Sequence, residues 1–361
     1  MTNREQEILN VIRKNPLISQ NELAEMFGIT RSSAAVHITN LIKKGYIQGK
    51  GYIVQEESYV LVAGGANIDI TGFPYENLRL KDSNPGKVSI SLGGVGRNIA
   101  ENLCKLVVPT KLITAIGDDL YGQKILEDAR QIGLDMQQSL ILKEHSTSTY
   151  LAVLDEQRDM RVAIAFMDII DKLSINFIKE KKHIIDSAKI CVVDTNLSKE
   201  VLEYIVVNHK NTQFLLDTVS TAKAMKVKDI IGYFHTIKPN KIEAEKLTGI
   251  KIEGGEDLRR AANCLLEKGV KRVIITLGEE GVYYNDGKEE HHITSPKIKV
   301  VNATGAGDAF MAALAYCGYY NLEAEYSIKF SMAASMLALS HEATINPNMS
   351  VESVKNKMLE I

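Results

Sequence analysis

Residues 302–310 read Asn-Ala-Thr-Gly-Ala-Gly-Asp-Ala-Phe, and an apolar helical pattern begins directly after them at Met311. Small residues at the start of a helix leave backbone N–H groups uncovered. These groups and the positive end of the helix dipole together bind phosphate oxygens. We therefore expect a phosphoryl group to lie against the backbone of Gly305, Ala306 and Gly307.

The same stretch contains a carboxylate, Asp308, in the first turn of the expected helix. An acid at this position can simply stabilise the helix dipole. Beside a phosphate site, however, a carboxylate repels the nucleotide, so its presence calls for a chemical task. Accepting the proton of an attacking hydroxyl is such a task. Asp308 is therefore the candidate general base.

A second glycine-rich segment, residues 93–100, reads Gly-Gly-Val-Gly-Arg-Asn-Ile-Ala. Glycines permit a ligand to approach the backbone closely, and the amide of Asn98 can both donate to and accept from vicinal hydroxyls. The alternative is a flexible entry to a helix. Neither segment is a Walker A loop, because GxxxxGK[ST] is absent, and the second lacks the last glycine of the dinucleotide pattern GxGxxG.

From Tyr59 onward, apolar strands alternate with amphipathic helices. This alternation predicts an α/β fold in which helices cover both faces of a parallel sheet, with ligands at the carboxyl ends of the strands. Segments near 71–92 and 147–167 are rich in strand formers and are predicted to form a small β lid. The expected strands are Val60–Ala63, Lys111–Ile116, Ile190–Asp194, Phe214–Asp217, His235–Lys238, Val273–Leu277 and Val282–Tyr284, and the expected helices are 98–107, 121–132, 241–248 and 256–268.

Residues 1–56 are expected to form a separate domain of three short helices followed by a small β element near Tyr52. Ser19 and Glu22 have capping-box spacing for the second helix, and Thr30 is placed to cap the third. This order resembles the winged helix-turn-helix domains of bacterial regulators.

In such a domain the third helix enters the major groove of DNA. The residues expected near bases or phosphates are Arg31, Ser32, Ser33 and His37. Residues 1–55 contain seven Lys/Arg and four Asp/Glu, a mildly basic balance that is compatible with phosphate contact. The alternative is a small helical domain that serves oligomerisation or has lost its operator.

The whole chain has a formal net charge of −2, which does not indicate a general nucleic-acid binder. The N-terminus has no apolar signal region and no apolar run approaches 18 residues, so we expect a soluble cytoplasmic protein with no membrane partner. The four cysteines are scattered without a CxxC pair, which argues against a zinc site.

Taken together, the two glycine segments resemble the ribokinase-like, or PfkB, family of carbohydrate kinases. The resemblance covers about 59–350, within a kinase domain expected at 59–361. Segments 67–69, 238–243 and 276–281 match further motifs of that family in the expected order. The resemblance implies a kinase that moves the γ-phosphate of ATP onto a sugar or nucleoside hydroxyl, with Mg²⁺ held through the phosphates. It also implies a homodimer.

The resemblance further implies roles for individual residues. The expected substrate-binding residues are Asn67, Asp69, Asn84, Gly93, Gly94, Asn98, Thr149 and Asp168. The expected ATP-binding residues are Asn240, Glu243, Thr276, Gly278, Gly281 and Thr304, with Asn240 and Glu243 also placing the waters of Mg²⁺.

A narrower resemblance is to bacterial pseudouridine kinases, with one departure at Phe166, whereas Asn302 departs from the wider family and is consistent with that branch. Many family members have Asp where this chain has Asn302, a position that helps to hold a monovalent cation, so dependence on such a cation stays open. Phe166 stands where that branch has an acid near the lid, and Asp168 either replaces the acid or ends a loop. Other nucleosides, ribose and fructose phosphates remain alternative substrates. An effector-sensing DNA-binding regulator remains an alternative function.

Overall fold

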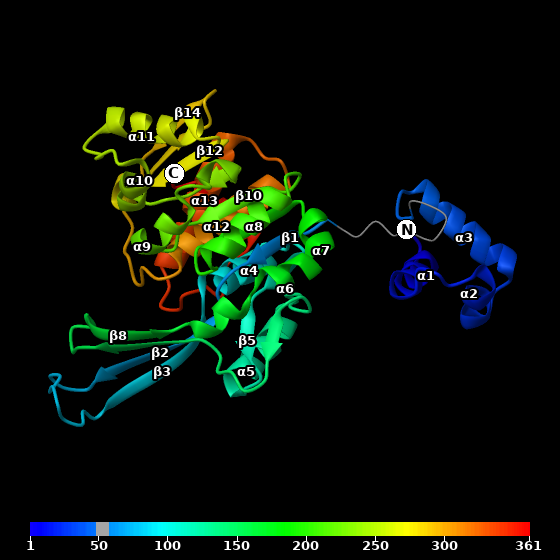
Figure 1. Ribbon diagram of the computed structural model, residues 1–361, viewed down its shortest axis with the longest axis horizontal. Helices are drawn as coiled ribbons and strands as arrows, with labels where there is room; N and C mark the ends of the chain where they lie inside the picture. Colours follow the sequence, from blue (N-terminus) through cyan, green and yellow to red (C-terminus); the bar gives the residue numbers. More distant parts are fainter. Residues whose placement is uncertain (48–57) are drawn as a thin grey trace. The chain divides into compact units, whose positions relative to one another are not determined.

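A computed structural model describes residues 1–47 and 58–361 (Figure 1). Contacts divide the chain into two compact units, Met1–Ser58 and Tyr59–Ile361. The wing expected near Tyr52 lies outside the described residues. No helix in the described part of the chain is both long enough and apolar enough to span a bilayer.

The described residues of the N-terminal unit form three helices, whose apolar faces meet in one small core around Leu9, Leu23 and Leu41. The predicted capping box of Ser19 and Glu22 and the Thr30 cap are both confirmed. The helices are α1 (Asn3–Lys14), α2 (Gln20–Phe27) and α3 (Arg31–Lys43).

An eight-stranded sheet forms the centre of the second unit, in the order β14-β13-β12-β11-β10-β9-β1-β4. The strands from β12 to β4 run parallel, as predicted, whereas β13 and β14 are antiparallel at one edge. The bounds are β1 (Val60–Ala63), β4 (Thr110–Ile113), β9 (Ile190–Asp194), β10 (Gln213–Asp217), β11 (Thr236–Ile237), β12 (Arg272–Thr276), β13 (Val282–Asn285) and β14 (Glu290–Ile293).

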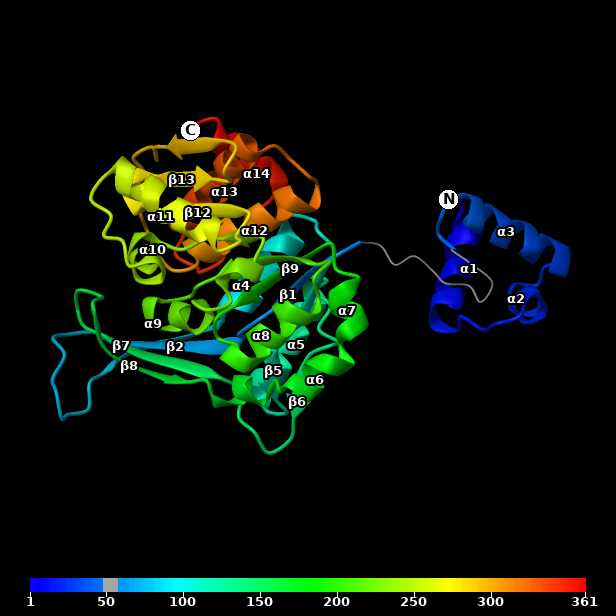
Figure 2. The same cartoon turned by 45° about the horizontal axis from the view of Figure 1, so that its top comes forward.

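Helices cover both faces of this sheet, because consecutive strand residues point to opposite sides: Leu61 packs into one core and Val62 into the other. One face is covered by α4 (Val95–Lys105), α5 (Leu120–Gln131), α12 (Ala306–Tyr319) and α13 (Ala324–Leu339). The other is covered mainly by α6 (Ile175–Glu180), α7 (Lys182–Asp186), α8 (Lys199–Asn208), α10 (Lys241–Thr248) and α11 (Gly255–Glu267) (Figure 2).

Shorter elements complete the unit. The predicted strand Lys111–Ile116 is divided in two, because β4 ends at Ile113 and β5 pairs separately with β6. These elements are β5 (Ala115–Gly117), β6 (Leu140–Leu142), η1 (Asp168–Lys172), α9 (Thr221–Ala224), η2 (Met225–Val227), η3 (Ile231–Tyr233), η4 (Gly278–Glu280) and α14 (Val351–Met358).

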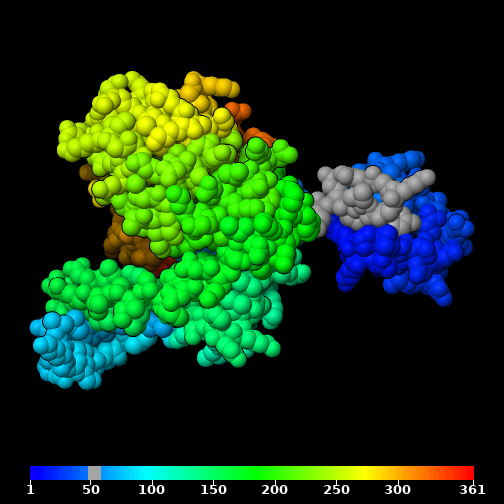
Figure 3. Space-filling view, in the orientation of Figure 1, coloured from blue at the N-terminus to red at the C-terminus, as the bar shows by residue number. Residues whose placement is uncertain are grey.

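A separate four-stranded sheet, which we call the lid, extends away from the main sheet (Figures 1 and 2). Its order is β3-β2-β7-β8, formed by β2 (Asn67–Pro74), β3 (Gly86–Gly93), β7 (Thr149–Leu154) and β8 (Met160–Phe166). Figure 3 shows a recess between the lid and the body of this unit.

The two faces of the lid differ in character. In register, Ile90, Ile70, Leu151 and Ile164 lie side by side on one face, and the neighbouring row Ser91, Asp69, Tyr150 and Ala165 lies on the other. The first face, called the apolar lid face below, is exposed at Val88, Ile90, Leu151, Val162, Ile164 and Phe166. The second, the polar lid face, has Asp69 at its inner end.

Candidate active site

The start of α12 has the geometry expected of a phosphate site. Gly305 precedes the helix with φ +83°, and a Cβ there would lie 2.2 Å from the carbonyl oxygen of Thr344, so only glycine fits. Ala306 and Gly307 then begin α12, and their N–H groups have no partner within the helix. These amides are therefore available to an anion.

A cavity of about 650 Å³ opens beside this helix start, and both Ala306 and Gly307 line it. Thr276, Gly278 and Gly281, all expected at the nucleotide, line the cavity as well. Thr304 does not line it and lies exposed in the preceding loop, where its N–H donates to Asn302 Oδ1 at 2.9 Å. Apolar residues from α13 and the 295–300 loop close the far side, and sequence reasoning did not assign them: Pro296, Ile298, Val300, Met332, Met336 and Leu339.

Lys238 lies in the same cavity and was not predicted as a site residue. A side chain at Gly307 would bring its Cβ to 3.6 Å from Lys238 Nζ, so the ammonium lies next to the start of α12. Lys238 Nζ also pairs with Asp217 Oδ2 at 3.3 Å, and both side chains are buried. The position directly after a buried strand was the signal that could have identified this lysine, because ligands gather at the carboxyl ends of parallel strands.

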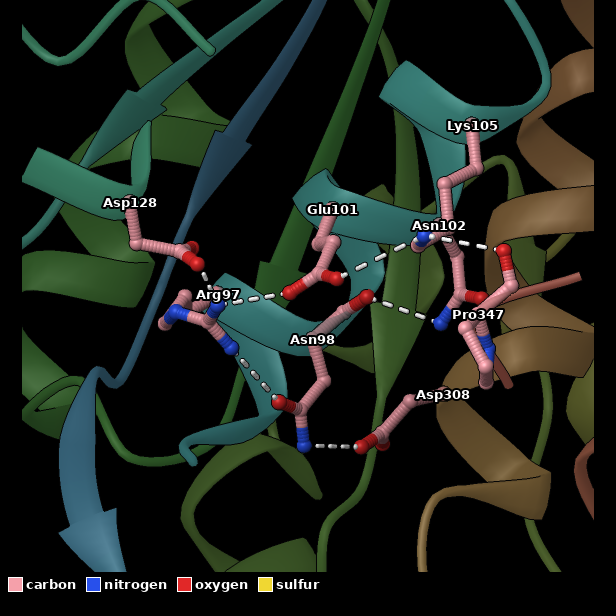
Figure 4. A network of polar contacts seen from close by, with 8 residues as sticks. All are labelled: Arg97, Asn98, Glu101, Asn102, Lys105, Asp128, Asp308 and Pro347. Atoms are coloured by element: carbon pink, nitrogen blue, oxygen red, sulfur yellow. Dashed lines mark hydrogen bonds and ion pairs between the residues drawn. The ribbon is translucent and has the colours of Figure 1, made fainter. Parts of the chain in front are cut away.

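Asp308 accepts a hydrogen bond from Asn98 at 2.8 Å, between Asn98 Nδ2 and Asp308 Oδ2 (Figure 4). Burial raises the pKa of Asp308 to about 7, and the negative charges of Asp217 and Asp194 add to the effect. Asn98 and the positive charge of Lys238 oppose it. A carboxylate that titrates near neutrality can accept a proton and release it again, as a general base requires.

Asp194 is a second buried carboxylate that the sequence did not single out. It ends β9 and accepts from the N–H groups of Gly65 at 2.9 Å and Asn196 at 2.8 Å. Burial raises its pKa to about 6 despite these bonds, with a further contribution from Asp217. Gly64 must lack a side chain, because a Cβ there would lie 2.1 Å from Asp194 Oδ2.

The expected sugar-binding residues of the first strand and glycine segment lie together. Asn67 Nδ2 donates to Asp69 Oδ1 at 2.6 Å, and a Cβ at Gly93 would lie 2.2 Å from Asp69 Oδ2. Burial raises the pKa of Asp69, while Asn67 and the charge of Arg97 lower it. Gly94, with φ +98°, precedes α4 and passes close to the backbone of Gly65. The glycines thus let the ends of β2 and β3 approach α4.

The remaining expected substrate residues lie in the lid or directly after its last strand. Asn84 is in the loop between β2 and β3, and its amide is bonded to the backbone of Arg79. Thr149 is in register with Ile68, which places it on the opposite side of the sheet from Asp69. Phe166 pairs with Thr149 and therefore belongs to the apolar lid face, and Asp168 is exposed at the start of η1.

Asn240 and Glu243 form a capping box at the start of α10. Glu243 Oε2 accepts from Asn240 N–H at 2.9 Å and from the Thr218 hydroxyl at 2.6 Å, while Oε1 accepts no hydrogen bond from the part of the chain that the structure describes. Among the described residues no cluster of three or more His, Cys, Asp or Glu could hold a metal ion by itself. Asn240 and Glu243 place an amide and a carboxylate at the start of α10, and oxygen atoms of these kinds suit the water shell of Mg²⁺.

In the N-terminal unit, Arg31 and Ser32 are exposed at the start of α3. The hydroxyls of Ser32 and Ser33 lie 3.0 and 2.9 Å from that of Thr30, so they also belong to the helix cap. His37 is half-buried, one turn further along. Val36, which sequence reasoning did not select, is 57% exposed on the same helix.

Residues 57–351 match the sequence model of the pfkB family of carbohydrate kinases, and residues 1–48 match that of a winged helix-turn-helix DNA-binding domain. The chain is 40% identical over 302 residues to pseudouridine kinase from Escherichia coli K12, covering 83% of this chain and 96% of that protein. It is 37% identical over 355 residues to the uncharacterized sugar kinase YeiI of the same organism, covering 98% of each.

Among solved structures, a Clostridium perfringens protein described as a sugar kinase matches with a TM-score of 0.78 and 42% identity. The match covers 84% of this chain and 96% of that protein. The alignment with YeiI spans 98% of both chains and therefore includes both units. The matches to pseudouridine kinase and to the Clostridium perfringens protein cover 83% and 84% of this chain, a share close to the size of the second unit.

Proposed function

Because this chain belongs to the pfkB family of carbohydrate kinases, we propose that it uses ATP to phosphorylate the 5′-hydroxyl of pseudouridine. The observation that carries the proposal is Asp308, a carboxylate with a pKa near neutrality, 2.8 Å from Asn98 and in the first turn of a helix that borders the large cavity. The identity of 40% to a pseudouridine kinase supports this substrate.

In the proposed reaction, Asp69, Gly94 and Asn98 orient the ribose at the inner end of the polar lid face. The 5′-hydroxyl oxygen attacks the γ-phosphorus, and its proton passes to Asp308. The bond from the γ-phosphorus to the bridging oxygen of ADP breaks as the new P–O bond forms. The backbone N–H groups of Ala306 and Gly307 stabilise the charge on the transferring group.

ATP would occupy the cavity, with its phosphates toward Lys238 and the start of α12 and its base against the apolar residues of α13. Thr276, Gly278 and Gly281 would contact the nucleotide, and Thr304 supports the loop before α12. Mg²⁺, carried on the phosphates, would supply charge neutralisation, with Asn240 and Glu243 placing its waters. Closure of the lid would exclude water from the recess.

Coupled ADP release with Mg·ATP tests the substrate. The panel is pseudouridine, uridine, cytidine, inosine, adenosine, ribose and fructose 6-phosphate, each at saturating concentration. We expect turnover with pseudouridine far above that with uridine. Turnover with another member of the panel would contradict the pseudouridine assignment and keep the mechanism. Silence on the whole panel, with ATP still bound, would favour an effector-sensing regulator.

The expected base-reading contact is where this chain departs from the pseudouridine kinase pattern, because Phe166 stands in place of an acid. Its register places Phe166 on the apolar lid face, away from Asp69. We therefore assign base recognition to the polar lid face and not to Phe166. Replacing Phe166 with Asp should leave the ratio of pseudouridine to uridine turnover unchanged, and a large change in that ratio would contradict this assignment.

A second proposed function is transcriptional regulation through the N-terminal unit. The match of residues 1–48 to winged helix-turn-helix DNA-binding domains supports it, as does the exposed start of α3 with Arg31 and Ser32. A gel shift with DNA upstream of the protein's own operon, with and without nucleoside, tests it. We expect a shift that Arg31→Ala weakens, and no shift at low salt would remove the proposal.

We also propose that the kinase unit is a homodimer through the apolar lid face. Val88 and Ile90 on one outer strand, β3, and Val162 and Ile164 on the other, β8, are between 47 and 64% exposed. Leu151 on β7 between them is 39% exposed, and such a contiguous apolar surface is unusual for a monomer. Sedimentation velocity should give a dimer for the wild type and a monomer for Ile164→Arg. Ala163→Arg on the opposite face is the matched control and should stay dimeric.

A further inference from the structure

Arg97 is a buried arginine that the proposed mechanism does not use. It lies on α4 next to Asn98, is 3% exposed, and its Nη2 contacts Glu101 and Asp128 at 2.6 Å each (Figure 4). Burying a guanidinium is costly unless it is fully paired, and the two carboxylates satisfy that requirement. They also hold the guanidinium in one place between α4 and α5.

The other terminal nitrogen of Arg97, Nη1, lies 3.4 Å from Asn98 Oδ1. A guanidinium has only donors, so the atom of the Asn98 amide that faces it must be the oxygen. The amide nitrogen of Asn98 then faces the other way, toward Asp308 Oδ2 at 2.8 Å. Asn102 fixes the backbone of the same residue, because its Nδ2 donates to the carbonyl oxygen of Asn98 at 2.9 Å.

We propose that Arg97 is a positioning residue for the phosphoryl transfer: by fixing the orientation of the Asn98 amide, it keeps an N–H donor directed at the carboxylate of Asp308. This inference rests on the proposed role of Asp308 as proton acceptor. If Arg97 is absent, the amide can rotate by half a turn and present its oxygen to Asp308. Two acceptors then face each other, and a proton on Asp308 relieves the repulsion.

The consequence for pH dependence follows from the groups that surround Asp308. Asp217 and Asp194, at the ends of β10 and β9, favour its protonated form, while Lys238 after β11 and Asn98 on α4 favour the carboxylate. Loss of the Asn98 donor removes one of the two opposing interactions. The pKa of Asp308 therefore rises, and a higher pH is needed to reach full activity.

Arg97 faces Glu101, Asp128 and also Asp69, whose pKa its charge lowers. Because Asp69 is expected to bind the sugar, its response to loss of Arg97 should appear in KM for the nucleoside. The response of Asp308 should appear in kcat at saturating nucleoside. The two readouts separate the effects on binding and on proton transfer.

The experiment measures kcat against pH for the full-length wild type, Arg97→Met and Arg97→Lys with saturating nucleoside and ATP. In the profile of kcat against pH, we expect the rise on the acid side (the acid limb) to occur about one pH unit higher in Arg97→Met than in the wild type, the size expected when a charged hydrogen bond is lost. Much of kcat should be recovered at high pH. Arg97→Lys keeps a donor and should lie closer to the wild type. Asp128→Asn weakens the anchoring of Arg97 but leaves Glu101 in place, and should not move the limb.

A second readout covers the case in which Arg97→Met has too little activity. The side-chain NH₂ signal of Asn98, assigned in ¹⁵N-asparagine-labelled protein, should titrate with Asp308 in the wild type and lose that titration in Arg97→Met. An acid limb at the wild-type pH, or an unchanged titration of Asn98, would overturn the positioning role. Failure of the proposed mechanism is distinguishable, because Asp308→Asn would then retain near wild-type turnover.

Discussion

Replacement of Asp308 with Asn should yield a protein that is inactive and yet more stable than the wild type. Asn has the same shape, and its oxygen can still accept the hydrogen bond from Asn98. The substitution removes the proton acceptor, which should lower kcat by roughly 10²–10⁴-fold. It also removes a negative charge that lies close to Asp217 and Asp194 and is largely removed from water.

The size of the stability gain follows from the pKa. In the folded protein the pKa of Asp308 is raised from 3.8 to about 7, so between these values the folded state holds a proton that the unfolded state has released. Stability of the wild type therefore falls by about 1.4 kcal/mol for each pH unit from about pH 4 to 7. Above pH 7 the full penalty is about 4 kcal/mol, an upper estimate for a carboxylate that retains some contact with solvent.

The assay is urea unfolding at pH 5.5 and pH 8.0, followed by circular dichroism because the chain has no tryptophan. The difference in free energy of unfolding between Asp308→Asn and the wild type should be larger at pH 8.0 than at pH 5.5 by about 2 kcal/mol. This value follows from the loss of wild-type stability per pH unit, summed between the two pH values. Asp171→Asn, at an exposed acid on η1, is the matched control and should show no such difference.

An advantage that does not change with pH would refute this reasoning, since it would mean that Asp308 has an ordinary pKa in the folded protein. Loss of stability at both pH values would also contradict it. ATP affinity, measured by titration of the same variant, should be retained or improved, because a negative charge near the phosphates has been removed.

Three further substitutions test the phosphate and nucleotide side. Gly305→Ala should lose activity and at least about 1–2 kcal/mol of stability, because a side chain at φ +83° strains the backbone and meets a carbonyl oxygen. Gly255→Ala, which has open space around it, is the control and should keep both activity and stability. Lys238→Met should raise KM for ATP and lower the free energy of unfolding by about 3–5 kcal/mol, because Asp217 is left buried without its partner. The double variant with Asp217→Asn should regain the stability but not the KM, as chemical unfolding and kinetics would show. The side-chain amide of Asn302 donates to the carbonyl oxygen of Glu342 and accepts from the N–H of Thr304. We therefore expect the activity of the wild type to be the same in K⁺ and Li⁺ salts. Asn302→Asp should require a monovalent cation.

Much of the fold was predictable because most of its strands are buried on both faces and appear as short apolar runs, as at Val60–Ala63 and Ile190–Asp194. The direction of a strand leaves no such mark. Val282–Tyr284 was found as a strand, but only its pairing shows that it runs antiparallel to β12. Hydrophobic pattern specifies burial, while orientation depends on the path of the connecting chain.

The site was predictable where its chemistry depends on local backbone, as at Gly305–Gly307, and less so where it depends on contacts between distant segments. Asn98 and Asp308 are separated by 210 positions in the chain, and nothing local to either indicates that they meet. Lys238 and Arg97 were overlooked for the same reason, since their importance comes from neighbours on other elements. The resemblance shows that Phe166 stands in place of an acid near the lid, but only the pairing of Phe166 with Thr149 shows on which face of the lid it lies.

The two faces of the lid have a consequence for how sequences of this kind can change. Side chains alternate from face to face along each strand, so substitutions at the Asp69 and Tyr150 row and at the Ile70 and Leu151 row can be selected separately. Insertion of one residue into β7 would exchange the rows and turn Leu151 toward the recess, whereas insertion of two would preserve both. Strand lengths in such lids should therefore drift in steps of two during evolution.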